Sequence, residues 1–301
     1  MTLQIFKVYL FAVLSMLFWG LSFVWFIIVV QWYDPITIIF LRLMISGLLM
    51  ILFMLVTRSW QTIKRKHLKY FLLLSFFQPF CYFLGESFGL TMVSSTIASV
   101  IIATIPLFSP FAAYFMVKEK VTVHIIAGIL VSFAGILLML FNPDFSLSAS
   151  PKGVLLLFLA VMAAIAYSVI IRKISHEYNP VTIITHQNLI GAIYFLPLFL
   201  VFDFKHFITV KPTWELVSAM LQLAVFASTL AYVFYIIAIK GMGMIKANIF
   251  TNLIPVFTGI FSFFILDEKF TAFKIAGMFL VMLGVLVSQS HRIGRILLKS
   301  K

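Results

Sequence analysis

Apolar stretches follow one another along almost the whole chain, separated by short polar connections. A helix of about 20 residues, rising 1.5 Å per residue, crosses the roughly 30 Å of hydrocarbon in a bilayer. We therefore predict an all-α integral membrane protein with ten transmembrane helices. The predicted spans lie near residues 8–30, 35–56, 68–90, 93–117, 122–141, 153–173, 180–202, 213–239, 244–266 and 271–290.

The fourth and fifth of these segments are repeated in the ninth and tenth. Residues 98–137 align without a gap to residues 247–286, and 13 of the 40 paired positions are identical. The shared positions include a mid-helix proline, a Glu-Lys-x-Thr sequence and two glycines. They are Pro106 and Pro255, Glu119 and Glu268, Gly128 and Gly277, and Gly135 and Gly284. An internal repeat in an apolar chain predicts two similar halves around a central site.

The repeat and the apolar pattern together divide the chain into four parts. We predict a first repeat of five spans at 9–141, an extracytoplasmic linker at 142–152, a second repeat of five spans at 153–289, and a basic cytoplasmic tail at 290–301.

Composition supports the membrane setting. Apolar residues (AVILMFWYC) make up 63% of the 301 residues and charged residues only 10%, with a mean hydropathy of +1.15. No soluble core needs so much apolar surface. The formal charge of +13 would suggest nucleic acid in a soluble protein, but most basic residues here flank apolar segments and are better explained as orientation signals. We expect a lipid bilayer as partner and no nucleic acid.

The sequence offers little for catalysis or cofactors. The single cysteine, Cys81, excludes an internal disulfide framework and any Cys-based metal site. The sequence contains no phosphate-binding Gly-rich loop and no hydrolase or metalloprotease motif. We therefore predict no enzyme activity, no metal, no cofactor and no ATP. Any energy source must then be an ion gradient or the substrate gradient itself.

The distribution of basic residues predicts an orientation. With the N-terminus placed inside, 16 of the 22 Lys and Arg residues fall in cytoplasmic segments, five fall in outer connections, and Arg42 lies within a span. This excess predicts that both termini are cytoplasmic. Because each half has five spans, an odd number, the second half runs through the membrane inverted relative to the first. Inverted repeats are typical of transporters that expose a midplane site alternately to the two sides.

Short motifs recur at corresponding places in the two halves. The first half carries Phe18-Trp19-Gly20, Pro35, Phe40-Leu41-Arg42, Gly89-Leu90, Pro106, Glu119 and the Gly128/Gly135 pair. The second half keeps Pro180, Ala247, Pro255, Glu268 and the Gly277/Gly284 pair, but has Tyr167-Ser168 for Trp19-Gly20 and Gln187 for Arg42. In these residues the chain resembles the drug/metabolite transporter superfamily, in its ten-span EamA-type branch. The resemblance implies a secondary transporter; members export amino acids, other metabolites or toxic compounds.

Two ionisable residues lie at membrane depth. Arg42 is seven residues into the second span, and Glu86 lies four or five residues from the end of the third. Such groups are costly in hydrocarbon and usually face a cavity, a partner or an ion path. Two interpretations stay open: the residues form a structural ion pair, or they bind substrate, with Glu86 also carrying a coupling proton. A salt bridge that opens on binding would do both. At the corresponding positions the second half has Gln187 and Tyr235.

Other polar and aromatic residues of the spans complete the predicted substrate site. Aromatic rings suit planar or cationic groups by stacking or cation–π contact, and amides either join helices or hydrogen-bond substrate. The predicted substrate-binding residues are Trp19, Arg42, Tyr82, Glu86, Tyr167, Gln187, Tyr235, Asn248 and Asn252.

Three further residues have two interpretations each. His186 either relays protons or packs as an ordinary histidine. Pro106 and Pro255 each remove a helical hydrogen bond, from the carbonyls of Ile102 and Thr251. The resulting kinks either line a wet cavity or serve packing alone.

These observations lead to one leading function and two alternatives. We predict a secondary transporter that exports small metabolites, in particular amino acids or related compounds, across the bacterial cytoplasmic membrane by alternating access, as a monomer or homodimer. Proton coupling through Glu86 is a hypothesis within that prediction. An uptake or facilitated-diffusion carrier for a vitamin or other metabolite is the first alternative. A polytopic membrane enzyme is the second, but its nucleophile–base pair or metal cluster is not visible in the sequence.

Overall fold

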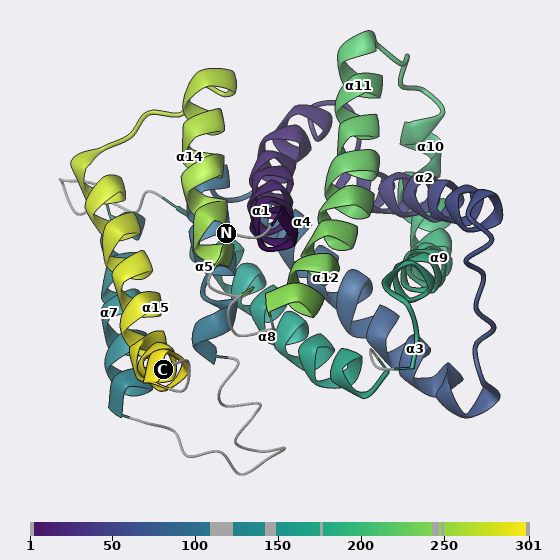
Figure 1. Cartoon of the computed structure of the whole chain (residues 1–301). Helices are drawn as coiled ribbons and strands as arrows, with labels where there is room; N and C mark the ends of the chain where they lie inside the picture. The colour runs from purple at the N-terminus through teal and green to yellow at the C-terminus, as the bar shows by residue number, and fades with distance from the viewer. Residues whose placement is uncertain are drawn as a thin grey trace.

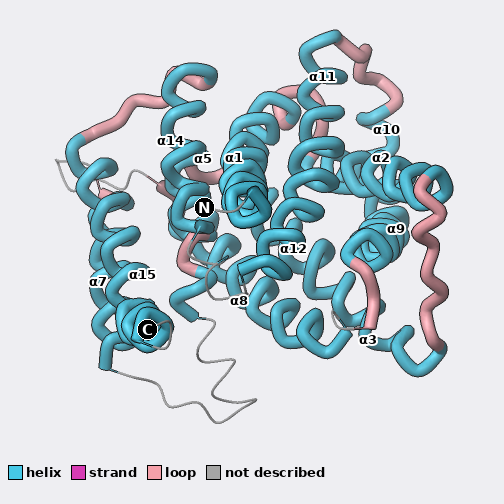
Figure 2. The backbone as a smooth tube through the Cα atoms, in the orientation of Figure 1, coloured by secondary structure: helices cyan, strands magenta, loops and turns pink. Residues whose placement is uncertain are grey.

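The computed structural model describes residues 3–108, 123–141, 149–174, 177–242, 247 and 250–298. These residues form helices and connecting loops, with no β-strand among them (Figure 2). By length and composition, six described helical segments could cross a membrane: Phe6–Val29, Pro35–Val56, Arg65–Leu90, Pro151–Ile171, Pro180–Phe207 and Trp214–Ala238. The described part also holds four shorter apolar helices: Ser95–Phe108, Ile126–Leu140, Phe250–Ile265 and Ala272–Val287.

The first repeat contains both regular and irregular helices. In chain order its described elements are α1 (Leu3–Val29), α2 (Pro35–Val56), the 3₁₀ turn η1 (Arg65–His67), α3 (Leu68–Ser75), the π-helical η2 (Phe76–Cys81), α4 (Tyr82–Leu90), α5 (Ser95–Ile102) and α7 (Val123–Leu140).

The second repeat follows the same plan. Its described elements are α8 (Pro151–Ile174), α9 (Pro180–Leu198), the π-helical η3 (Phe199–Asp203), α10 (Phe204–Phe207), α11 (Trp214–Gln222), the π-helical η4 (Leu223–Leu230), α12 (Ala231–Met242), the 3₁₀ turn η5 (Phe250–Asn252), α14 (Leu253–Ile265) and α15 (Ala272–Leu298).

The third predicted span, 68–90, corresponds to the helical segment Arg65–Leu90, which contains a break. Helix α3 ends at Ser75, η2 follows, and α4 begins only at Tyr82. Within η2 the backbone of Gln78 has φ −144° and ψ 115°, which is outside the helical region. Pro79 comes next and has no N–H to donate to the helical ladder. Hydropathy predicts where such a segment is buried, but it does not report whether the hydrogen-bond ladder within the segment is unbroken.

The two repeats are irregular at corresponding places. With the 149-residue offset of the repeat, η2 falls on residues 225–230, which belong to η4. Irregular backbone at membrane depth survives only where protein buries it or where it lines a cavity. Both segments face the middle of the bundle: η2 packs against α8 and α9, while η4 packs against α1 and α2.

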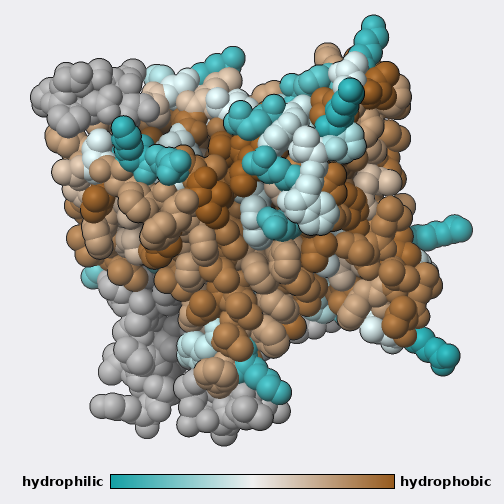
Figure 3. All heavy atoms as spheres, turned by 90° about the horizontal axis from the view of Figure 1, so that it is seen from above, coloured by the Kyte–Doolittle hydropathy of each residue, from teal (hydrophilic) through white to brown (hydrophobic). Residues whose placement is uncertain are grey.

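The helices pack in a row of neighbouring pairs. Figure 1 shows α7 and α15 side by side at one edge of the bundle and α2 beside α9 towards the other, with α1, α8 and α12 between. Helix α14 packs against α1 and α5, and α4 packs against α8. The face seen in Figure 3 is predominantly hydrophobic, and its hydrophilic residues gather in the upper part of the view and at the margins. An apolar belt of this kind suits contact with lipid.

Candidate functional site

Two charged side chains are buried in the middle of the bundle. Arg42 on α2 is 4% exposed and Glu86 on α4 is 7% exposed. The Nε atom of Arg42 donates a hydrogen bond of 2.9 Å to Ser228 Oγ on η4, and the guanidinium lies 4.3 Å from the ring centroid of Phe83. The hydroxyl of Tyr82 donates a 2.8 Å hydrogen bond to Glu86 Oε1. Each charge therefore has partners of its own.

Arg42 and Glu86 do not touch each other directly. The ion pairs found within 4.0 Å among the described residues do not include these two. The two charges are still close enough to attract one another electrostatically. Because each keeps a separate hydrogen-bond partner, a solute can approach either charge without breaking a salt bridge first. This arrangement favours the binding interpretation over a purely structural ion pair.

An aromatic wall lies beside the charged groups. The indole of Trp19 on α1 meets Tyr232 and Tyr235 of α12 edge to face, with centroid distances of 5.1 and 5.0 Å. Tyr232 also accepts a 2.7 Å hydrogen bond at its hydroxyl from Gln78 Nε2 on η2, and it is close enough to both buried charges to interact with them. The wall thus joins side chains from the two repeats.

Tyr167 and Gln187 extend the same group of side chains. The hydroxyl of Tyr167 on α8 donates a 3.2 Å hydrogen bond to Gln187 Oε1 on α9, and Tyr167 lies within electrostatic range of Tyr232 and Tyr235. Seven of the nine predicted substrate-binding residues are therefore brought together. We name the whole group the central cluster: Trp19, Arg42, Gln78, Tyr82, Glu86, Tyr167, Gln187, Ser228, Tyr232 and Tyr235.

A hydroxyl and amide network supports the Arg42 side of the central cluster. Asn188 Nδ2 donates a 2.8 Å hydrogen bond to Ser46 Oγ, and Ser46 Oγ donates to the carbonyl of Ser228 over 3.1 Å. Ser46 also shares a 2.8 Å hydrogen bond with Thr229 Oγ1. Both Ser228 and Thr229 belong to η4, so the irregular turn supplies partners to α2 and α9 at once.

His186 lies apart from the central cluster. Its Nδ1 donates to the carbonyl of Thr182, 2.8 Å away on the same helix. Its ring packs edge to face against Phe71 at 5.7 Å and Trp60 at 6.2 Å. A hydrogen bond to backbone within an aromatic pocket is how a packing histidine is satisfied, and we interpret His186 in that way.

Of the two predicted asparagines, Asn248 lies outside the described residues. Asn252 ends η5 and is 7% exposed, and neither of its amide atoms has a hydrogen-bond partner among the described residues.

Irregular turns accompany the two repeat-related prolines. Helix α5 ends at Ile102, and helical structure resumes at residues 105–108, which include Pro106. Pro255 is the third residue of α14, directly after η5. Each proline therefore lies just after the point where its span changes geometry.

Sequence reasoning missed Gln78, Ser46 and Ser228. A signal for Gln78 was present, because a glutamine followed by a proline interrupts an otherwise apolar span in the sequence FFQPFC. Nothing comparable marked the two serines, since small hydroxyl residues occur in many apolar helices without contacting a site.

The central cluster brings together groups that are able to bind a solute. It offers one guanidinium, one carboxylate, several phenols, an indole and two amides, which together can hold a polar solute with charges of both signs. In the described ranges, no three side chains of His, Cys, Asp or Glu lie together as a group that could hold a metal ion.

The family model and the curated relatives that match this chain are described as transporters. A family model described as the EamA-like transporter family matches residues 6–141 and 151–289. An uncharacterized transporter of Archaeoglobus fulgidus is 26% identical over 288 residues, covering 95% of this chain and 98% of its own. The uncharacterized transporter YetK of Bacillus subtilis is 25% identical, over 82% of this chain and 76% of its own. One crystal structure superimposes with a TM-score of 0.67 at 16% identity, covering 94% of this chain and 98% of that chain, which supports the fold alone.

Proposed function

Because the chain belongs to the EamA-like transporter family, we propose that it is a secondary transporter that exports amino acids or related small metabolites across the bacterial cytoplasmic membrane. Six described helices are long and apolar enough to cross a membrane, and four shorter apolar helices fall within the other four predicted spans, which supports our proposal of ten spans. We place both termini in the cytoplasm, in agreement with the excess of basic residues in the inner segments. The second repeat is then inverted relative to the first.

One observation carries the proposal: two opposite charges are buried without touching, among side chains from both repeats. Burying an ionised group costs several kcal/mol even with partners, and membrane proteins retain such groups mainly where function needs them. A zwitterion carries one charge that is complementary to Arg42 and one that is complementary to Glu86. In this proposal Arg42 receives the carboxylate and Glu86 the ammonium group, while Trp19 and Tyr235 contact the rest of the solute.

The location of the central cluster suits alternating access. Its members come from α1, α2, η2 and α4 of the first repeat and from α8, α9, η4 and α12 of the second. A solute held there binds both halves, and small movements of one half against the other can open the site to either side of the membrane. Binding energy shared between the halves is what allows a solute to bias such movements.

A comparison of metabolites tests the proposed direction and substrate class. Cells that overproduce the protein, its Glu86→Gln variant or its Arg58→Gln variant are compared for amino acids and related compounds inside the cells and in the medium. Arg58 is an exposed basic residue in the turn after α2 and serves as the matched control. We expect one group of compounds to accumulate in the medium with the wild type and the control, and not with Glu86→Gln.

Two other outcomes would change the proposal. Accumulation of a compound inside the cells would favour an uptake carrier on the same fold. The absence of a shift in every metabolite would exclude the exporter.

Proton coupling is tested separately in proteoliposomes with an imposed pH gradient. If Glu86 carries the proton, flux of the identified compound depends on the gradient in the wild type and loses that dependence in Glu86→Gln. Equal gradient dependence in the two proteins would remove Glu86 from the coupling mechanism without affecting the assignment of transport.

A further inference from the structure

Gln78 connects a helix break in one repeat to the aromatic wall of the other. Its side chain is 9% exposed, and its backbone is the non-helical point of the third span. The amide donates a 2.7 Å hydrogen bond to the hydroxyl of Tyr232, 154 residues away in the sequence. A residue at the break thus holds a side chain that belongs to the opposite half of the molecule.

Tyr232 lies where a bound solute would change its surroundings. Its ring meets Trp19 edge to face at 5.1 Å, and it lies within electrostatic range of Arg42 and Glu86. A solute held by these two charges therefore changes the electrostatic environment of the Tyr232 phenol and can move it. Any movement of that phenol changes its hydrogen bond with Gln78.

The break is tightly packed where Pro79 meets α9. A Cβ atom on Gly191 of α9 would collide with the ring of Pro79, so only glycine lets α9 approach the break this closely. Pro79 also has no N–H with which to complete the helical ladder. The joint between α3 and α4 therefore rests against α9 and lacks the hydrogen bond that would stiffen an ordinary helix.

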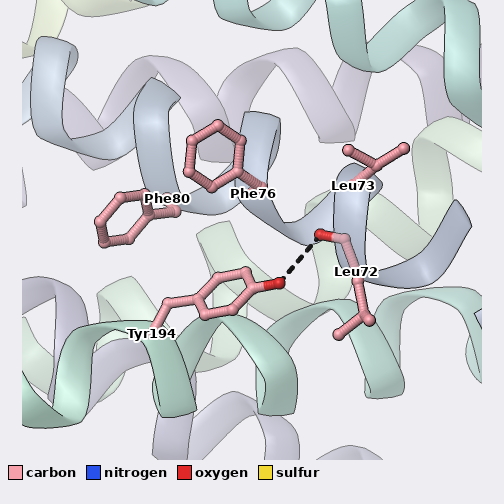
Figure 4. A pocket seen from close by; sticks show the side chains of 5 residues that line it. All are labelled: Leu72, Leu73, Phe76, Phe80 and Tyr194. Atoms are coloured by element: carbon pink, nitrogen blue, oxygen red, sulfur yellow. Dashed lines mark hydrogen bonds between the residues drawn. The ribbon is translucent and has the colours of Figure 1, made fainter. Parts of the chain in front are cut away.

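The same break has an open region where α3 and η2 meet Tyr194 of α9. A hollow of about 490 Å³ lies there, lined by Leu72, Leu73, Phe76, Phe80 and Tyr194. Figure 4 shows the rings of Phe76, Phe80 and Tyr194 around this hollow, with the Tyr194 hydroxyl directed at the backbone of Leu72. That hydroxyl donates a 3.2 Å hydrogen bond to the Leu72 carbonyl. Helix α3 therefore borders a hollow through Leu72 and Leu73 and has room to move towards it.

We propose that Gln78 is a positioning residue that couples occupation of the substrate site to the angle of the third span at its break. This inference rests on the proposed transport function, because it assumes that a solute binds beside Tyr232. When Tyr232 is held by Gln78, the break keeps the conformation described above. When the solute moves Tyr232, the hydrogen bond is lost and α3 can move towards the hollow.

The chain contains its own reporter for this movement. Cys81 is its single cysteine, it is the last residue of η2, and it is partly buried. The rate at which its thiol reacts with N-ethylmaleimide depends on how far the break exposes it. No reporter group has to be introduced.

The first experiment measures this reaction rate by mass spectrometry on the full chain in lipid vesicles. We compare the wild type, Gln78→Ala, Tyr232→Phe, the double variant and the control Gln31→Ala. Gln31 is exposed at the end of α1 and donates only to the carbonyl of Ile27. We expect Cys81 to react about 5-fold faster in each single variant than in the wild type. The double variant should react no faster than either single variant, since both changes remove one shared interaction. The control should react at the wild-type rate.

Two results of this experiment would overturn the inference. One is a wild-type rate in Tyr232→Phe, which keeps the ring and the fold and removes only the hydroxyl. The other is a double variant whose rate is the product of the two single effects, which would show that the residues act independently.

A second readout separates positioning from a merely structural role. In transport of the compound found by the metabolite comparison, Gln78→Ala should lower the maximal rate about 10-fold and change the half-saturating concentration less than 2-fold. A change confined to half-saturation would contradict the coupling role. If no compound is transported, the proposed function fails; the labelling rates still decide whether Gln78 holds the break.

Discussion

The helix pair α7–α15 and the central cluster use the same repeat in opposite ways. In α7 and α15 the described backbone is uninterrupted α-helix, and Gly135 and Gly277 bring the two backbones so close that a Cβ on either would overlap the other's carbonyl. In the central cluster the helices are irregular and are joined by side-chain hydrogen bonds. Small residues suit permanent contact between helices in a membrane, whereas irregular backbone is kept where it faces a site.

The two copies of the repeat also differ between these regions. The paired glycines of α7 and α15 are identical in both halves. The central cluster pairs Arg42 with Gln187 and Glu86 with Tyr235 at corresponding positions. Packing therefore preserves the symmetry of the repeat, while the charged chemistry is present in one half only.

The largest expected effect comes from replacing the buried arginine of the first half by glutamine, the residue at the corresponding position of the second half. Arg42→Gln gives the first half the residue of the second and leaves Glu86 buried without its opposite charge. In the proposed site Arg42 receives the carboxylate of the solute. Removing one partner of a buried, hydrogen-bonded charge pair costs about 2–5 kcal/mol of binding, so we expect flux at low solute concentration to fall about 100-fold or more. Flux per folded protein in proteoliposomes measures this.

The control for that variant is Arg58→Gln, which removes an exposed charge and should leave flux unchanged. If Arg42→Gln kept the flux and the half-saturating concentration of the wild type, the arginine that is present in only one half would not be needed to bind the solute.

A smaller effect is expected from a change in the α7–α15 pair. Gly277→Ala places a methyl group against the Gly135 carbonyl and Met139, and overpacking of this kind costs about 1–3 kcal/mol. We expect a lower thermal unfolding temperature in detergent. Gly259→Ala is the matched control, because its new methyl would meet only Phe270, at 3.5 Å. The control should gain up to about 1 kcal/mol from helix propensity, and an equal loss in both would contradict close packing as the role of Gly277.

The same contrast explains how much the sequence could predict. Apolar length located the helices, since each described apolar helix overlaps a predicted span, and the repeat-related glycines were visible in the sequence. These features depend on residues near each other in the sequence. Chemical type alone also selected most members of the central cluster, because Arg42 and Glu86 are conspicuous in an apolar span.

The contacts within the central cluster were beyond such reasoning. The hydrogen bond between Gln78 and Tyr232 joins residues 154 positions apart, and no periodicity specifies it. The partner of Arg42 depends on η4, whose π-helical turn changes which side chains face inward. Hydrophobic patterns assume a constant turn angle and cannot register that change.

A more modest effect is expected from a single hydroxyl at the edge of the central cluster. Tyr167→Phe removes the 3.2 Å hydrogen bond to Gln187 and keeps the aromatic ring. A neutral hydrogen bond of this type contributes about 0.5–1.5 kcal/mol, so we expect half-saturation to rise by roughly 2- to 10-fold. Concentration-dependent flux measures it. Unchanged half-saturation would confine solute contact to the side of the central cluster formed by Arg42 and Glu86.

The smallest expected effect concerns an exposed ion pair outside the spans. Lys64 Nζ lies 2.9 Å from Glu177 Oε2, and His67 Nε2 lies 3.4 Å from Glu177 Oε1. The hydrogen bond from Lys64, with a further contribution from the charge on His67, lowers the pKa of Glu177 below its usual value. A carboxyl whose pKa is lowered by folding stabilises the fold above its ordinary pKa, and that stabilisation is lost as the pH falls through the folded value.

Glu177→Gln should therefore unfold at a slightly lower temperature than the wild type at pH 7, and the difference should shrink in acid, as the pH falls through the lowered pKa of Glu177. Added salt should also reduce it, because exposed charges are screened. Thermal unfolding at pH 7 and in acid measures the effect. A difference that persisted in acid would mean that Glu177 stabilises the protein through contacts other than its charge. Because Glu177 and its partners lie outside the central cluster, the same variant should transport solute at the wild-type rate, and reduced transport would extend the functional region to this loop.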